Sequence, residues 1–154
     1  MYSGSHSKAR VGVLTIDNVI HNKLQTIRRC CQRIWEEYGG TPTNLENITK
    51  QDAIILNLQR ACEAAIDLAM HVVAVRKLGF PQTSREAFEM LEQAGIIDET
   101  TCRRMKAMVG FRNIAIHDYQ SIDIDVVQTI IEKHLTDFQT YCDQVLRAEE
   151  GAPS

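Results

Sequence analysis

The chain has 154 residues, of which 44% are hydrophobic and 24% are charged, and its formal net charge is −3. This length and composition predict one folded domain and exclude general disorder. The slight acidic excess also argues against a protein that binds nucleic acid through a large overall positive charge.

The spacing of apolar residues predicts a long first helix after a flexible N-terminal leader. Residues 1–15 are rich in Ser and Gly, and we expect them to form that leader. From Ile16 to Tyr38 apolar side chains recur every three or four positions, which indicates one buried helix face. The pair Gly39-Gly40 then ends the helix.

A second and central helix is predicted from about Thr49 to about Leu78, with Pro81 beyond its end. Its apolar residues cover more than one stripe of the helix surface. This pattern is typical of a helix packed on two sides.

Three further helices are indicated by their start signals. Thr83 with Glu86 forms a capping box, Asp98 can cap a fourth helix, and Asp123 can cap the last one. We expect residues 149–154 to be a flexible tail. The sequence therefore predicts an all-α domain over 16–148, an antiparallel bundle of four to five helices with apolar surface left for a homodimer interface.

The segment RNIAIHDY, from Arg112 to Tyr119, places four polar functional groups in an otherwise apolar helix. On a regular helix Arg112 and His117 lie about 140° apart, so their side chains would not meet at one phosphate. Convergence requires that the helix ends or distorts near His117, or that a second copy completes the site across a two-fold axis.

Arg and His together suffice for RNA cleavage without a metal. Arg is a permanent planar cation suited to phosphate, and His exchanges a proton near neutral pH. His117 would move the proton of the ribose 2′-hydroxyl or of the leaving 5′-oxygen, while Arg112 stabilises the phosphorane charge. On spacing alone, an ion-pairing Arg and a capping or packed His are more common than a catalytic pair, and Asp118 can equally end the helix and Tyr119 can be a core aromatic.

The motif Arg-x4-His-x-Tyr in RNIAIHDY resembles the signature of HepT, the HEPN-domain ribonuclease toxins of type VII toxin–antitoxin systems. ILNLQRACEAAIDLA, LGFPQTSREAF and MVGFRNIAIHDY also resemble segments of that family, in the family's order. The resemblance covers residues 16–148. It implies a HEPN-like fold and a homodimeric, metal-independent endoribonuclease without a cofactor, with Arg112 and His117 as catalytic residues in a cleft at the dimer interface.

The resemblance also implies a protein partner. Toxins of this family are paired with a nucleotidyltransferase antitoxin, MntA, that transfers AMP from ATP to the motif tyrosine, here Tyr119. The added phosphate charge and bulk would keep RNA out of the cleft.

Several other polar residues are candidates for supporting roles. Asn113 and Asp118 could orient His117 or the substrate, and the helix-two residues Asn57, Arg60 and Glu63 could line the cleft. The acidic net charge conflicts with an RNA substrate unless the basic residues of the fourth helix form a local patch. Those residues are Arg103, Arg104, Lys106 and Arg112.

Two other functions fit the sequence. In the first, the bundle is a non-catalytic module that docks a minimal nucleotidyltransferase. In the second, it is a metal hydrolase built on His71, His117 and His134, although no metal-binding spacing joins these residues. Five cysteines without a CxxC pair, no signal peptide and no membrane-spanning run predict a cytoplasmic protein with reduced thiols.

Overall fold

A computed structural model describes residues 4–151, and for residues 4–17 it describes only the backbone. Within this range the secondary structure is entirely helical, without strands. In chain order the elements are α1 (Gly4–Tyr38), the 3₁₀ helix η1 (Pro42–Glu46), α2 (Ile48–Val75), α3 (Ser84–Gln93), α4 (Glu99–His117), the 3₁₀ helix η2 (Tyr119–Ser121), α5 (Ile124–Thr129), the π-helical turn η3 (Ile130–His134) and α6 (Leu135–Glu150). When the interrupted last helix α5–η3–α6 is counted once, five α-helices are described, as the sequence predicted.

The capping residues set the starts of the helices as expected. The Thr83 hydroxyl accepts a hydrogen bond from Glu86 N at 3.1 Å, and the Asp98 carboxylate accepts one from Thr101 N at 2.7 Å. Asp123 caps α5 in the same way. These bonds satisfy amide groups that have no partner within the helix.

The ends of the first and last helices differ from the sequence prediction. The first helix begins at Gly4 rather than near Ile16, and the last helix continues through Glu150 into the predicted tail. Residues 1–3 and 152–154 lie outside the described range, and the mobility expected of both ends stays a prediction. Apolar periodicity marks only the part of a helix that packs on a core, so it does not reveal a helical extension beyond that core.

The second helix also ends earlier than predicted, at Val75. Lys77 adopts a left-handed conformation with φ of 54°, and Leu78 N donates a hydrogen bond to Val73 O at 3.0 Å. This is the Schellman geometry that closes a helix, here with Lys at the position that usually carries Gly.

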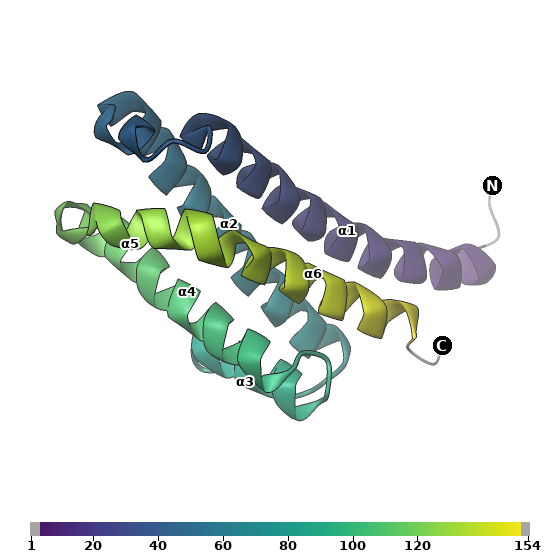
Figure 1. The fold of residues 1–154 in the computed structure, drawn as a ribbon. Coiled ribbons are helices and arrows are strands. Elements are labelled where there is room, and N and C mark those ends of the chain that lie inside the picture. Colours follow the sequence, from purple (N-terminus) through teal and green to yellow (C-terminus); the bar gives the residue numbers. More distant parts are fainter. Residues whose placement is uncertain (1–3, 152–154) are drawn as a thin grey trace.

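The helices pack as two antiparallel pairs around one core (Figure 1). α1 runs beside α2, the last helix runs beside α4, and the short α3 covers α2 and α4 at one end of the bundle. α2 is the central helix, as predicted, because it packs against α1, α3 and α4. No helix in the described part of the chain is both long and apolar enough to cross a membrane.

The last helix contains a π-helical turn that apolar periodicity did not predict. Ile130 and Ile131 of this turn are buried, and the buried Tyr38 hydroxyl of α1 donates a hydrogen bond to Glu132. A π turn inserts one residue into the helix and shifts the register of the side chains that follow. His134 is the last residue of this turn, and its Nδ1 lies 2.8 Å from Asp137 Oδ2 at the start of α6.

Candidate functional site

Arg112 lies on α4, and its guanidinium turns toward α3 and α2. Its Nη2 lies 3.5 Å from Ser84 Oγ of α3, and its charge acts on the buried Cys62 thiol of α2, whose pKa is raised mainly by burial. Arg112 Nε is buried without a hydrogen-bond partner among residues 4–151. Among residues 18–151, whose side chains the structure describes, no carboxylate forms an ion pair with Arg112.

His117 is the last residue of α4, and its side chain is exposed. Because α4 stays α-helical from Glu99 to His117, the side chains of Arg112 and His117 point about 140° apart. The helix does end at His117, but no distortion before it brings the two side chains together. The two side chains therefore leave α4 in different directions.

Asp118 ends α4 and starts the turn that follows. Its backbone N–H donates to Ile114 O at 2.8 Å, and its carboxylate accepts a hydrogen bond from the Ser121 hydroxyl at 2.5 Å. No hydrogen bond joins Asp118 to His117 in the described range, so the structure gives Asp118 a role in the turn. The expectation that it orients His117 stays a prediction.

Tyr119 stands in η2, two residues after His117, and 42% of its surface is exposed. It is therefore not a core residue. Its hydroxyl donates a hydrogen bond to Asp52 Oδ1 of α2 at 2.5 Å. Burial of the hydroxyl, together with the hydrogen bond to the Asp52 carboxylate and the charge of that carboxylate, raises the pKa of Tyr119 to about 12.

The other candidate residues are scattered around the motif. Asn57 is buried and its amide donates to Ala53 O within α2 at 2.9 Å, which satisfies the side chain locally. Arg60 is exposed, and Glu63 and Asn113 are half-buried. Among the described residues no hydrogen bond or ion pair connects these four to Arg112 or His117, so their supporting roles stay predictions.

An apolar groove of about 550 Å³ lies between α4 and the last helix. Ala107, Gly110 and Ile114 of α4 form one wall, and Val126 and Ile130 contribute to the other. Ile114 and Val126 are 44% and 47% exposed, which is unusual for large aliphatic side chains beside a polar motif. The groove and the motif therefore share one helix.

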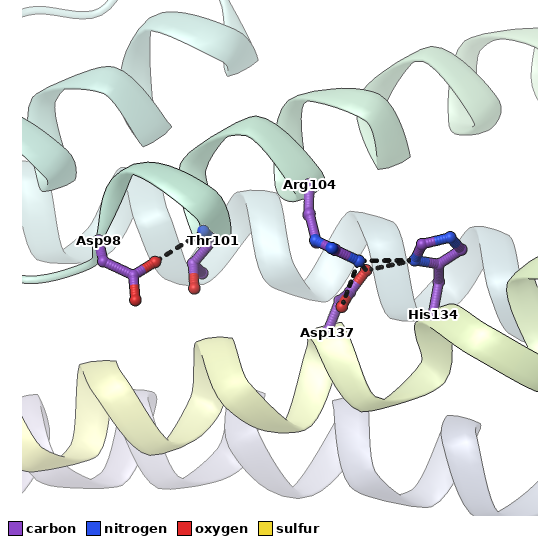
Figure 2. A network of polar contacts seen from close by, with 5 residues as sticks. All are labelled: Asp98, Thr101, Arg104, His134 and Asp137. Atoms are coloured by element: carbon purple, nitrogen blue, oxygen red, sulfur yellow. Dashed lines mark hydrogen bonds and ion pairs between the residues drawn. The ribbon is translucent and has the colours of Figure 1, made fainter.

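Polar residues also line this groove, and Figure 2 shows the network that they form. The Asp137 carboxylate lies 3.3 Å from Arg104 Nη1 and 2.8 Å from His134 Nδ1, which joins α4 to the last helix at the π turn. On the same helix α4, Lys106 pairs with Glu89 at 2.7 Å. Carboxylates therefore pair with two of the four basic residues expected to form a local patch on α4, and the patch itself stays a prediction.

Comparisons with known proteins decide the family. A family model described as ribonuclease HepT-like matches residues 24–145. A protein of Shewanella oneidensis named mRNA nuclease HepT is 44% identical over 134 residues, which are 87% of this chain and all of that protein. The chain belongs to the HepT-like ribonuclease family. The resemblance on RNIAIHDY and its neighbouring segments is thereby confirmed.

Solved structures of toxin–antitoxin complexes have the same fold as this HepT-like chain. A crystal structure of a toxin–antitoxin with AMP-PNP matches with a TM-score of 0.81 and 42% identity, over 84% of this chain and 98% of that one. A tri-AMPylated Shewanella oneidensis HEPN toxin in complex with an MNT antitoxin matches with a TM-score of 0.80 and 43% identity, over 84% and 97%. The HEPN-like all-α fold is confirmed, and the homodimer stays a prediction.

Sequence reasoning did not find Asp52 and Ser84, which contact the HepT motif. Asp52 is 67 positions from Tyr119, and Ser84 is 28 positions from Arg112. Both contacts depend on how α2 and α3 pack against the end of α4, and no local spacing encodes that packing. In the described part of the chain, no group of three or more His, Cys, Asp or Glu side chains could hold a metal ion. The three histidines His71, His117 and His134 therefore form no such group there.

Proposed function

We propose that this HepT-like protein is a toxin that cleaves RNA without a metal, at a site that two copies of the chain build together. The observation that carries the proposal is the divergence of Arg112 and His117 on a regular α4. Both residue types suit the chemistry, but one chain cannot direct both at the same phosphate. A two-fold axis beside α4 would bring the Arg112 of one copy toward the His117 of the other.

The exposed face of α4 supports this arrangement. Ala107 and Gly110 are small residues in the groove, and Ile114 beside them is large and exposed. Small residues let a second helix approach closely, and an exposed aliphatic side chain gains free energy when it is buried. Because Ile114 lies between Arg112 and His117 in sequence, a second copy seated here would also lie beside the motif.

The proposed reaction needs only groups that the chain provides. The His117 imidazole of one copy takes the proton of the ribose 2′-hydroxyl, and the imidazolium that results supplies a proton to the leaving 5′-oxygen. Arg112 stabilises the negative charge that develops on the non-bridging oxygens of the phosphorane. Its weakly held Nη2 is the donor that would gain a phosphate oxygen. The product is a 2′,3′-cyclic phosphate.

We further propose that an MntA-like nucleotidyltransferase antitoxin controls the site by AMPylation of Tyr119. The related Shewanella toxin is tri-AMPylated and bound to an MNT antitoxin. In this chain Tyr119 is a partly exposed residue that lies two positions after His117. An AMP group there would place a phosphate anion and a nucleoside beside the cleft, where it would repel and obstruct RNA.

The test is cleavage of RNA by the purified protein and by His117→Ala, with His21→Ala as a matched control. His21 is an exposed histidine on α1, away from the motif. We expect His117→Ala to lose cleavage and toxicity while it stays folded, His21→Ala to retain both, and wild-type cleavage to persist in excess EDTA. If His117→Ala cleaves RNA and remains toxic at the wild-type level, the proposed site is wrong, and a module that only docks a nucleotidyltransferase becomes the better account.

A further inference from the structure

One contact near the motif has no part in the proposed RNA cleavage. The Tyr119 hydroxyl donates to Asp52 Oδ1 at 2.5 Å, and this bond joins the turn after α4 to the first turns of α2. Among the described residues Asp52 has no cationic partner, and its nearest basic neighbour in sequence, Lys50, pairs with Glu37 at 3.7 Å. In the described part of the chain no cation therefore neutralises the Asp52 carboxylate. This carboxylate accepts the hydrogen bond of the Tyr119 hydroxyl, whose proton is the one that the side chain can transfer.

The environment of Tyr119 makes this proton difficult to remove. Burial and Asp52 together hold the pKa of Tyr119 at about 12, so the phenol is un-ionised near neutral pH. A neutral phenol is a weak nucleophile, and an adjacent base that takes its proton during attack is the usual means of activation. Tyr119 as a whole is 42% exposed, so a second protein can approach the residue.

Building on the proposed AMPylation of Tyr119, we propose that Asp52 is a catalytic residue of that modification, the general base that the toxin itself contributes. The Tyr119 Oη attacks the α-phosphorus of ATP held by the transferase, and a new O–P bond forms. The bond from the α-phosphorus to the bridging oxygen breaks, and pyrophosphate leaves. The phenolic proton passes to Asp52 Oδ1 and later to water, so charge and atoms balance.

The structure also distinguishes this role from a purely structural one. If the hydrogen bond only held the turn in place, its loss would free the hydroxyl and lower the pKa of Tyr119, because Asp52 raises that pKa. Modification would then proceed at the wild-type rate or faster. A general base predicts the opposite result, a slower transfer when the carboxylate is replaced by an amide.

The experiment measures AMP incorporation by intact mass, with Mg·ATP and the MNT antitoxin of the Shewanella oneidensis pair as the transferase. The variants are Asp52→Asn, Asp52→Glu and Tyr119→Phe, with Asp67→Asn as the matched control. Asp67 is an exposed carboxylate on the same helix, in a surface ion pair with Lys23 at 3.2 Å. Because Asp52 is exposed as well, Asp52→Asn is expected to fold normally.

We expect Asp52→Asn to lower kcat for AMP transfer by roughly 100-fold with little change in KM for ATP, since the base acts on the proton and not on the nucleotide. The remaining rate should rise roughly tenfold per pH unit, because it depends on the ionised phenol. Asp52→Glu should restore part of the rate, and Asp67→Asn should match the wild type. Transfer to Asp52→Asn at or above the wild-type rate would overturn the inference, as would AMP incorporation into Tyr119→Phe.

RNA cleavage by the same proteins without the transferase separates this inference from the proposed nuclease. Asp52→Asn should cleave RNA like the wild type, because Asp52 takes no part in that reaction. If neither protein cleaves RNA, the nuclease proposal fails while the transfer rates still decide the role of Asp52. If both cleave RNA but the transfer rates are equal, the nuclease stands and Asp52 is not a base.

Discussion

At the scale of single residues, Arg112 is one of two described residues with a buried side-chain nitrogen that lacks a hydrogen-bond partner, the other being His71. Its Nε is buried and, within residues 4–151, has no partner, and its one side-chain hydrogen bond, to Ser84, is long at 3.5 Å. A buried donor without a partner costs free energy unless a ligand satisfies it. A phosphate oxygen from RNA would do so.

We therefore predict that Arg112→Lys lowers kcat/KM for RNA by roughly 100-fold although the charge is kept, because lysine lacks the planar fork of donors. Cleavage of a short RNA, followed by detection of the 2′,3′-cyclic phosphate end, measures the effect. Arg33→Lys, an exposed arginine on α1, is the matched control and should be unaffected. Full activity of Arg112→Lys would show that only charge is needed at this position.

The sequence led to Arg112, His117 and Tyr119 because local spacing and family resemblance both concern residues near one another in the chain. It did not lead to Ser84 or Asp52, whose contacts with the motif depend on packing between helices. It also suggested Asn57 as a cleft residue, whereas the structure buries Asn57 and satisfies its amide within α2. A polar residue in an apolar helix can serve the helix itself, and sequence alone does not separate that use from catalysis.

At the scale of secondary structure, the end of α2 contains backbone strain that can be relieved. Lys77 has a φ of 54°, which is unfavourable for any residue with a Cβ. Lys77→Gly should raise the free energy of unfolding by about 0.5–1 kcal/mol, after allowance for the greater flexibility of glycine in the unfolded chain. Urea unfolding measures the change. Lys77→Ala retains the Cβ and should give no such gain, and an equal gain for both variants would contradict this explanation.

The start of α4 should make stability depend on pH. The hydrogen bonds from Thr101, first its backbone N–H and then its hydroxyl, lower the pKa of Asp98, and the carboxylate also accepts one from Gln144. The folded state therefore binds the Asp98 proton more weakly than the unfolded state. The resulting stability is present above the unfolded pKa and is lost as pH falls through the lower folded pKa.

Asp98→Ala should accordingly cost about 1 kcal/mol of unfolding free energy at pH 7, the usual value of an N-cap. The difference from the wild type should shrink as pH falls below about 4. Thermal or urea unfolding of both proteins across this range measures it. A difference that stays constant down to pH 2 would mean that the carboxylate charge contributes nothing to the cap.

Capping residues and apolar spacing predicted the order of the helices and several of their starts, because both signals are local. The earlier end of α2 was not foreseen, since the chain turns at a lysine where a glycine was expected to mark the end. The π turn was not foreseen either. Apolar residues recur every three or four positions across this turn, so their spacing does not mark it, and only the packing against α1 and α4 reveals it.

At the scale of the whole molecule, the account depends on the second copy expected at the groove beside α4. Ile114→Glu should place a charge at that surface and raise the dimer dissociation constant by roughly tenfold or more. Because Ile114 is already 44% exposed, the helical signal in circular dichroism should be retained. RNA cleavage should fall together with the dimer fraction measured by analytical ultracentrifugation.

Val75→Glu is the matched control, since Val75 is an exposed aliphatic residue at the far end of α2. It should leave both the dimer and the activity unchanged. The result that contradicts the account is a monomeric Ile114→Glu protein with full RNA cleavage. In that case the groove would be an interface without a part in the reaction.

The most direct test of a site shared between two copies is a mixing experiment. Arg112→Ala and His117→Ala are each expected to be inactive alone. Mixed in equal amounts and allowed to exchange, they should recover roughly a quarter of the wild-type cleavage, because half of the dimers are mixed and each mixed dimer rebuilds one of two sites. If the mixture cleaves no RNA although mass spectrometry shows that mixed dimers have formed, Arg112 and His117 do not act across the interface, and the shared site is wrong.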